Sequence, residues 1–204
     1  VAMGGFHPTL MPDEVSEHAD AVIIGDGEDT WPNVFKDVEK KTLQKRYMSQ
    51  RPAIGKLIPN RNILRGRKYL PVSLVESSRG CLFDCQFCSI TNFSKRTFRA
   101  RAIDAIVKEI DGLSNKSIFF VDDNIVMNME RAKELFRALI PLKVRWFSQG
   151  SIHMAKDDEL LSLMKKSGCL GLLIGFASLN KDNLRQMNKP VHNGVEDYIR
   201  AIAR

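Results

Sequence analysis

Three cysteines, Cys81, Cys85 and Cys88, lie close together in the spacing C-x3-C-x2-C. An extracellular disulfide framework is not indicated, because the clustered cysteines are odd in number and Cys169 lies far away in an apolar segment. A structural zinc site normally needs four ligands, often as two C-x2-C pairs, and only one such pair occurs here. Three thiolates on one loop instead suit a cubane iron–sulfur cluster, in which each cysteine binds one iron and the fourth iron stays open for a substrate or cofactor.

The cysteine segment follows an apolar run of strand length, and further runs of this kind alternate with helical patterns. We expect strands at residues 72–76, 117–122, 144–149 and 170–176, and amphipathic helices at 103–113, 129–139 and 160–164. Strands without clean alternation, separated by amphipathic helices, indicate a parallel sheet covered by helices. Four β/α units fit an open sheet or part of a barrel, since a closed barrel needs about 250 residues. Either fold places the chemistry at the carboxyl ends of the strands.

The composition is that of a globular α/β protein with two parts. The chain has 204 residues, 44% hydrophobic and 27% charged, which excludes collagen, a coiled coil and wholesale disorder. Prolines and glycines interrupt residues 43–71, so we expect a linker there. Residues 1–42 read as the end of an α/β domain, with a strand at 21–25 and a helix starting near Thr30, and residues 72–204 form the second domain. Because the chain begins at Val1 rather than at Met and stops at Arg204 within an unfinished helical pattern, we interpret it as an internal fragment.

The net charge of +7 is concentrated in two basic clusters. The first, between Arg61 and Lys68, is typical of a solvated face or linker. The second lies beside the cysteines and contains Arg99 and Arg101, which could bind anions or form ion pairs that stabilise the fold. No apolar run reaches the ~20 residues of a membrane helix and no signal peptide is visible, so we expect no membrane span. A cytoplasmic protein is expected because exposed cluster thiols are sensitive to oxygen.

The cysteine spacing, its place after the first strand of a β/α series and Phe87 before the third cysteine resemble the radical S-adenosylmethionine (SAM) superfamily. The resemblance covers residues 71–204 and implies a partial (β/α) TIM-like barrel. It also implies a [4Fe–4S] cluster on Cys81, Cys85 and Cys88, whose open iron chelates the methionine moiety of SAM. Electron transfer from the reduced cluster then cleaves SAM to a 5′-deoxyadenosyl radical. A small-molecule substrate and an external electron donor of the flavodoxin or ferredoxin type are implied as partners.

The same resemblance implies further cofactor contacts at the ends of the strands. These cofactor-binding candidates are Phe87, Asp122, Asp123, Asn124, Gln149, Ser151 and Ser178. An N-cap of the following helix is the alternative for residues 122–124, and ordinary surface-loop polarity is the alternative for Gln149 and Ser151. Ala177 replaces the glutamate that the family usually carries before Ser178, so a carboxylate assigned to ribose or methionine contacts is missing, and Ser178 is the residue that could substitute for it in part.

The first forty residues are similar to the last part of the Rossmann-like cobalamin-binding domain that precedes the radical domain in one large subfamily. The similarity rests on Gly4, Gly5 and the turn Gly25-Asp26-Gly27-Glu28, where the subfamily pattern is Gly-Glu-Gly-Glu. Glycines at such turns let the backbone approach a ligand closely, here the nucleotide tail of cobalamin, or they permit tight turns without a ligand. The cobalt-ligating Asp-x-His-x-x-Gly motif does not occur in the chain, and His7 does not stand in that context. Cobalamin is therefore an expected but open cofactor.

Three functions remain in view. The first is cobalamin-dependent methyl transfer, or a related C–H modification, by a radical SAM enzyme. The second is a cobalamin-independent radical SAM enzyme for methylthio transfer or RNA modification; only the basic residues between Arg61 and Lys68 support nucleic acid, which is otherwise not expected as a partner. The third is a non-catalytic iron–sulfur or zinc protein that transfers electrons, for which Cys169 would be the remaining thiol ligand. Otherwise Cys169 is expected to be a small buried apolar residue.

Overall fold

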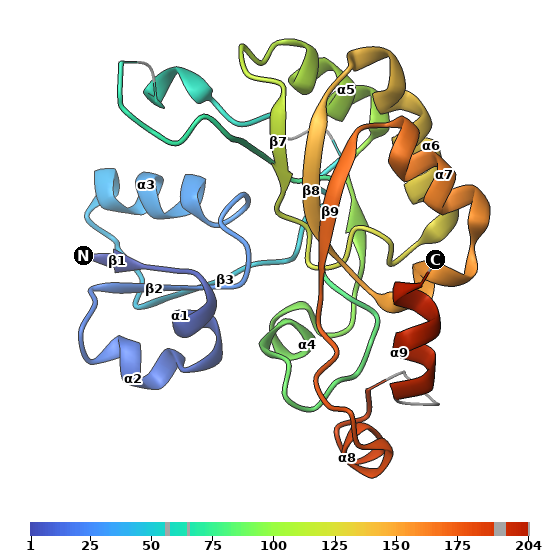
Figure 1. The fold of residues 1–204 in the computed structure, drawn as a ribbon. Coiled ribbons are helices and arrows are strands. Elements are labelled where there is room, and N and C mark those ends of the chain that lie inside the picture. Colours follow the sequence, from blue (N-terminus) through green and yellow to red (C-terminus); the bar gives the residue numbers. More distant parts are fainter. Residues whose placement is uncertain (56–57, 65, 190–194, 204) are drawn as a thin grey trace. The chain divides into compact units, whose positions relative to one another are not determined.

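The computed structural model describes residues 1–55, 58–64, 66–189 and 195–203, which divide into two compact units, Val1–Ala53 and Ile54–Arg204 (Figure 1). The first unit contains, in order, β1 (Ala2–Met3), α1 (Phe6–Leu10), α2 (Pro12–Ser16), β2 (Ala21–Ile24), α3 (Trp31–Lys40) and β3 (Arg46–Met48). The second unit contains β4 (Ser73–Val75), β5 (Ser78–Arg79), α4 (Ser89–Ser94), β6 (Arg99–Ala100), α5 (Ile103–Asp111), β7 (Ser117–Phe120), α6 (Met129–Leu139), β8 (Arg145–Gly150), α7 (Asp158–Lys166), β9 (Cys169–Ile174), α8 (Lys181–Gln186) and α9 (Val195–Ile202). Short 3-10 helices lie at Arg61–Leu64, Ile140–Leu142 and Ile152–Lys156.

The first unit is a parallel three-stranded sheet in the order β1-β2-β3. Successive side chains of a strand point to opposite faces. Ala21 and Ile23 of β2 accordingly pack with Val34 of α3, whereas Val22 packs with Val15 of α2. The sheet is thus covered on both faces.

The boundary between the two parts differs from the sequence prediction. Residues 43–71 were expected to be a linker, yet they contain β3, which pairs with β2. The first unit therefore runs to Ala53 rather than to residue 42. Because β3 is only three residues long and buries a single side chain, Tyr47, its sequence carries no alternation that would identify a strand.

The second unit is built on a parallel sheet in the order β4-β7-β8-β9. These are the four strands that the sequence predicts, and the helices α5, α6 and α7 that connect them also correspond to predicted helices. The α/β prediction of a partial barrel is confirmed in this unit. Among the described residues, no helix combines the length and the apolar character that crossing a membrane requires.

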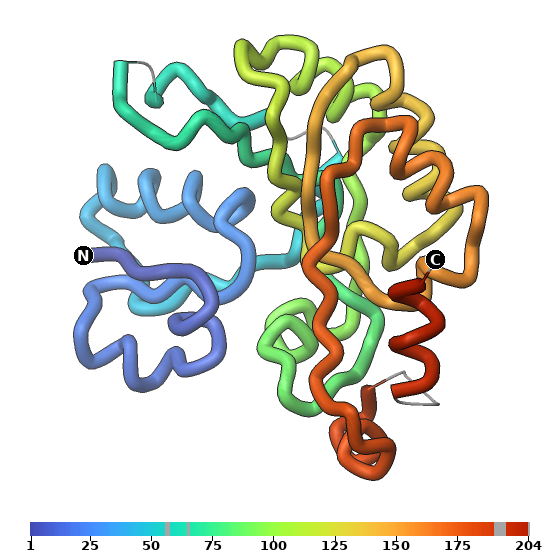
Figure 2. Tube along the Cα trace, in the orientation of Figure 1, coloured from blue at the N-terminus to red at the C-terminus, as the bar shows by residue number. Residues whose placement is uncertain are grey.

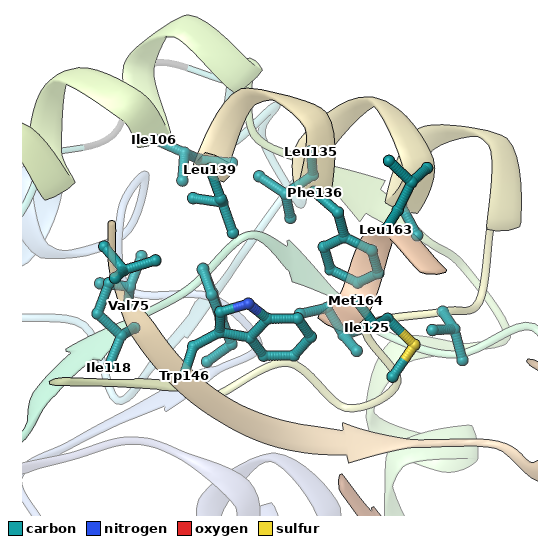
Figure 3. Packing of buried hydrophobic residues seen from close by; sticks show 14 of the residues in the cluster. Val75, Ile106, Ile118, Ile125, Leu135, Phe136, Leu139, Trp146, Leu163 and Met164 are labelled. Carbon is teal, nitrogen blue, oxygen red and sulfur yellow. The ribbon is translucent and has the colours of Figure 1, made fainter. Parts of the chain in front are cut away.

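Helices α5, α6 and α7 bury one face of this sheet in a continuous apolar core. Trp146 of β8 lies within this core, with the Phe136 ring stacked on it at 4.9 Å between centroids (Figure 3). The Phe120 ring lies edge-on to Trp146 at 5.7 Å between centroids. Trp146 also satisfies its indole N–H by donating to the Ser167 hydroxyl at 3.1 Å. This packing fixes the strands whose carboxyl ends carry the polar candidate residues.

The opposite face of the sheet carries apolar side chains that no described helix covers. Leu74, Phe147 and Leu173 are 55%, 38% and 71% exposed, and Phe119 stacks on Phe147 at 4.9 Å between ring centroids. A wide cavity of about 1050 Å³ adjoins this face between the strands and residues 59–64 and 69–72. The prediction of a sheet covered by helices therefore holds for one face of the described sheet, and β9 is its edge strand.

Candidate cluster and cofactor site

The three cysteines lie in the segment between β4 and α5, outside the four-stranded sheet (green in Figure 2). Its two ends are joined because β5 pairs antiparallel with β6, with Ser78 opposite Ala100 and Arg79 opposite Arg99. Arg79 also makes two hydrogen bonds to the Glu76 carboxylate, at 2.8 and 2.9 Å. The loop that carries the cysteines is therefore closed at its base before any metal is considered.

Gly80 makes this closure sterically feasible. It has φ +91°, in the region that favours glycine, and a Cβ built at this position would lie 2.1 Å from the carbonyl oxygen of Thr97. Any residue with a Cβ at this position would collide with Thr97, so only glycine lets these two parts of the loop approach so closely. The glycine before the first cysteine thus has a backbone requirement of its own.

The cysteines themselves are reduced thiols at the carboxyl end of β4. Cys85 is buried, while Cys81 and Cys88 are partly exposed. The backbone N–H of Cys88 donates to the carbonyl of Cys85 at 3.0 Å, and Cys88 then begins α4 as its N-cap residue. Burial raises the pKa of the Cys81 and Cys85 thiols, so a metal that binds their thiolates must displace protons.

This donor set fits a cluster rather than a single ion. Within the described ranges, no three histidine, cysteine or acidic side chains converge closely enough to hold one metal ion. A cubane does not require such convergence, because each cysteine binds a different iron. Three thiols on a closed loop at the carboxyl end of a parallel sheet are therefore a suitable frame for [4Fe–4S].

Asp122 ties the next strand to the base of the loop. Its carboxylate is fully buried and accepts from the Ser77 N–H at 2.9 Å, from the Ser77 hydroxyl at 2.6 Å and from the Ser78 hydroxyl. Burial raises the pKa of Asp122 to about 6, while the serine hydrogen bonds act in the opposite direction. Both carboxylate oxygens of Asp122, a residue predicted to bind a cofactor, thus accept hydrogen bonds from the protein itself.

Asp123 and Asn124 continue the same arrangement toward the cysteines. Asp123 accepts from the Gly80 N–H at 2.7 Å. Asn124 is buried and donates through Nδ2 to the Met127 thioether at 3.7 Å, and the same sulfur lies 3.5 Å from Cys81 Sγ. Among the described residues, Asn124 Oδ1 has no hydrogen-bond donor although it is buried. A buried acceptor without a donor among the described residues therefore lies beside the cysteine loop.

The alternative N-cap role of residues 122–124 is wrong for the following helix. Asn128 is the N-cap residue of α6, and its side chain accepts from the Arg131 N–H at 3.1 Å. Arg131 in turn reaches back and donates to the carbonyl oxygens of Ser77 and Arg101. Nothing in the sequence around Ser77, Ser78, Met127 or Arg131 signalled these contacts, because each depends on strands pairing far apart in the chain.

The second basic cluster is partly structural. Arg101 is almost fully buried, lies 2.7 Å from the Glu109 carboxylate and donates to the Glu76 carbonyl. Arg61 pairs with the same Glu109 from the other side, so this member of the first cluster is not simply solvated. The ion-pair interpretation of Arg101 is confirmed.

The remaining predicted cofactor residues lie at the same ends of the later strands. Gln149 lies near the end of β8, where its backbone carbonyl accepts from the Ile125 N–H, and Ser151 follows it as the N-cap residue of a 3-10 helix. Ser178 lies beyond β9, and its hydroxyl accepts from the Asn180 N–H at 3.1 Å. Phe87 is 57% exposed on the cysteine loop. No described contact joins these four side chains to one another.

Cys169 begins β9, and Ala177 lies just beyond the end of the same strand. Ala177 has φ +64°, a left-handed conformation that is strained for a residue with a Cβ. Cys169 opens β9 and is paired in register with Trp146, so it lies at the amino end of the strands, opposite the cluster loop. It packs against the core, and burial raises the pKa of its thiol to about 11. The structure thus contradicts a role for Cys169 as fourth cluster ligand.

In the first unit, the glycines of the predicted cobalamin turn are in contact with protein. A Cβ on Gly25 would lie 2.9 Å from the Ser49 side chain, and one on Gly27 would lie 2.9 Å from the Trp31 ring. Gly25 also has φ +93°. These positions therefore need glycine on steric grounds within the unit.

A family profile described as the radical SAM superfamily matches residues 75–204, which is more than half of the chain. The chain belongs to this superfamily, as the cysteine spacing predicted. It is 31% identical over 210 residues to the bacteriochlorophyllide d C-12(1)-methyltransferase of Chlorobaculum tepidum, covering 97% of this chain and 46% of that protein. It is 24% identical to the hopanoid C-3 methylase of Methylococcus capsulatus, covering 94% of this chain and 42% of that protein.

The fold is similar to that of the radical SAM methyltransferase TsrM from Kitasatospora setae solved with cobalamin and a [4Fe–4S] cluster. The TM-score is 0.75 at 16% identity, and the match covers 100% of this chain and 48% of TsrM. The chain therefore spans about half the length of the proteins it resembles. The similarity confirms the predicted α/β fold across both units.

Proposed function

We propose that the full-length protein is a cobalamin-dependent radical SAM enzyme that transfers a methyl group, or makes a related C–H modification, on a small-molecule substrate. The observation that carries the proposal is the closed cysteine loop, held at the carboxyl end of the sheet by Gly80 and Asp122. The methyl-transfer part is supported by the methyltransferase names of relatives that match nearly the whole chain. Cobalamin is supported by the TsrM structure and by the sequence resemblance of the first unit.

In this proposal the described residues hold and orient the cofactors. Cys81, Cys85 and Cys88 would bind a [4Fe–4S] cluster, which with SAM supplies the 5′-deoxyadenosyl radical when bound. Asp122 and Asp123 fix the loop rather than touch a cofactor. This assignment replaces the expectation that both aspartates bind SAM directly.

Asn124 is the strongest candidate for direct contact with SAM. Its Oδ1 is buried without a donor among the described residues, and an amide oxygen accepts readily from an ammonium group such as that of methionine. Gln149, Ser151, Phe87 and Ser178 are proposed as further cofactor contacts, because they also lie at or beyond the carboxyl ends of the strands.

Partners follow from the chemistry. Reductive cleavage of SAM consumes an electron, so we include an external donor of the flavodoxin or ferredoxin type. The cytoplasm is the compartment proposed, because cluster cysteines must remain reduced.

The test begins with anaerobic reconstitution of the full-length protein. Iron and acid-labile sulfide should reach the content of one cubane, and the electron paramagnetic resonance (EPR) signal of the dithionite-reduced protein should change when SAM is added. Turnover with reductant should release 5′-deoxyadenosine. Cys85→Ala should abolish all three results, whereas Cys169→Ala, which removes the thiol at the other end of the sheet, should leave them intact. A wild-type protein without a cubane signal would overturn the proposal.

Two further measurements test its finer parts. Asn124→Ala should keep the iron content but weaken the effect of SAM on the EPR signal, and an unchanged SAM response would remove Asn124 from the site. Hydroxocobalamin should co-elute with the full-length protein in gel filtration. A cluster that responds to SAM in a protein that retains no cobalamin would favour the cobalamin-independent alternative.

A further inference from the structure

The segment that follows α8 is held in one conformation. The Lys189 N–H donates to the Leu184 carbonyl at 2.9 Å and the Asn188 N–H donates to the Arg185 carbonyl at 3.0 Å, while Asn188 adopts φ +52°. This pattern is a Schellman motif, which ends a helix with one residue in the left-handed conformation. Leu184 is itself fully buried against Tyr198, so the helix that carries the motif is anchored. The backbone of Lys189 is therefore fixed rather than part of a free surface loop.

This segment lies directly on the cysteine loop. The Gln86 N–H donates to the Met187 carbonyl at 3.0 Å, and the Asn188 side chain donates to Asp84 at 3.4 Å. The Lys189 ammonium lies 5.8 Å from the centroid of the Phe87 ring, within the range of a cation–π contact. Figure 2 shows the two segments, green and red, at the same end of the chain trace. Residues about one hundred positions apart in sequence thus meet between the second and third cysteines.

The contact brings a positive charge to the loop. The Lys189 ammonium lies against Phe87, between Cys85 and Cys88, so its charge is close to any cluster that these cysteines hold. The neighbouring Asp84 carries a negative charge, but it pairs with Arg96 at 3.1 Å and accepts a hydrogen bond from the Asn188 side chain. Net charge near an iron–sulfur cluster is one of the factors that set its reduction potential. A fixed cation stabilises the reduced state more, since reduction adds one negative charge.

We infer that Lys189 tunes the cluster of the cysteine loop, raising its reduction potential through its position on the Schellman motif beyond α8. This inference rests on the proposed function, because it requires a cluster on Cys81, Cys85 and Cys88. Lys189 acts through the cluster and is a positioning residue rather than a catalytic one. The sequence offers no sign of it, since a lysine after a short helix is ordinarily a solvated surface residue.

The test compares three variants of the reconstituted full-length protein by redox titration followed by EPR. Lys189→Met keeps the length of the side chain but removes the charge, and Lys189→Arg keeps the charge. Lys181→Met removes the same charge from the other end of α8 and is the matched control. Lys189→Met should shift the midpoint to a more negative potential, with on the order of tenfold less reduced cluster at a fixed poise. Lys189→Arg and Lys181→Met should titrate like the wild type, and all proteins should hold equal iron.

The outcomes separate the inference from the proposed function. A wild-type protein without a cubane signal overturns both. A normal wild-type cluster with an unchanged midpoint in Lys189→Met overturns the role of Lys189 alone. Loss of iron from Lys189→Met also overturns it, because Lys189 would then be needed to assemble the loop rather than to tune the cluster.

Discussion

The helix-covered face of the four-stranded sheet and its carboxyl end are constructed from different interactions. On the face, Trp146 and its neighbours exclude water through apolar contact, and the buried indole N–H and Ser148 hydroxyl each donate a hydrogen bond within the packing. At the carboxyl end, buried Asp122 and a glycine with positive φ hold a loop through directional hydrogen bonds. Substitutions on the face should therefore lower global stability, whereas substitutions at the end should remove iron while the fold persists.

The largest loss of stability should follow Trp146→Ala. It removes the most central aromatic ring of the core, and such truncations cost about 3–5 kcal/mol. Urea denaturation should show this loss. Phe147→Ala, one residue further on the same strand but on the open face, should cost only about 1 kcal/mol, since Phe147 is 38% exposed. Equal costs would show that the open face is as tightly packed as the covered one.

Gly80→Ala should separate iron binding from folding. The added Cβ would meet the Thr97 carbonyl, and left-handed backbone strain adds about 1–3 kcal/mol, so the base of the cysteine loop must open. We expect iron content to fall severalfold while the circular dichroism of the folded protein remains. Gly171→Ala, where no atom lies within 4 Å of the added Cβ, is the control and should retain its iron. Full iron in Gly80→Ala would contradict the assigned role of the closure.

Asp122→Asn should change how stability depends on pH. Burial raises the folded-state pKa of Asp122 to about 6, so the folded protein binds a proton that the unfolded chain has already released. The resulting stabilisation is fully present below about pH 4 and is lost as pH rises through 6, a change on the order of 2 kcal/mol. Glu76 and Arg131 are the charged neighbours, and neither is altered by the substitution.

Urea denaturation between pH 4 and 8 measures this effect. The wild type should lose stability across that interval relative to Asp122→Asn, in which the titrating group is gone. Asp111→Asn, an exposed carboxylate at the end of α5, should behave like the wild type. Parallel curves for wild type and Asp122→Asn would show that the carboxylate is ionised and compensated in the folded state.

The smallest effect should come from Ala177→Gly, and it should be stabilising. Ala177 holds φ +64°, and glycine removes the steric cost of that conformation, so the free energy of unfolding should rise by about 1 kcal/mol. Ala105→Gly within α5 should lower it by about as much, because glycine weakens a helix. Thermal unfolding distinguishes the two. A loss of stability in Ala177→Gly would mean that the methyl group has a packing role.

The elements of the core could be predicted from sequence because each repeats a local pattern. The apolar stripe of α5 and the β-branched or aromatic run of β7 identify themselves within a dozen residues. β3 could not be predicted, since a three-residue strand in a region with prolines acquires its identity only from pairing with β2.

The same limit applies to the candidate site: its local spacing could be predicted from sequence, and its contacts between distant segments could not. The three cysteines lie within one short segment, so their spacing was sufficient to suggest a cluster. The contacts of Asp122 with Ser77, and of Met187 with Gln86, join residues that are distant in sequence and depend on strand order. Asp122 was selected for its place at a strand end, but the sequence did not indicate its hydrogen bonds to Ser77 and Ser78.

The hydrogen bonds from Ser77 and Ser78 to Asp122 also impose an order of events during synthesis. At ~5–20 residues per second, a ribosome makes Asp122 about 2–7 s after Cys88. During that interval the hydrogen bonds of Asp122 to Ser77 and Ser78 cannot form, so the base of the cysteine loop has only its local β5–β6 pairing. The nascent thiols are exposed to oxidants and stray metal ions in that window, and delivery of a cluster into its final geometry has to follow the emergence of β7 from the exit tunnel.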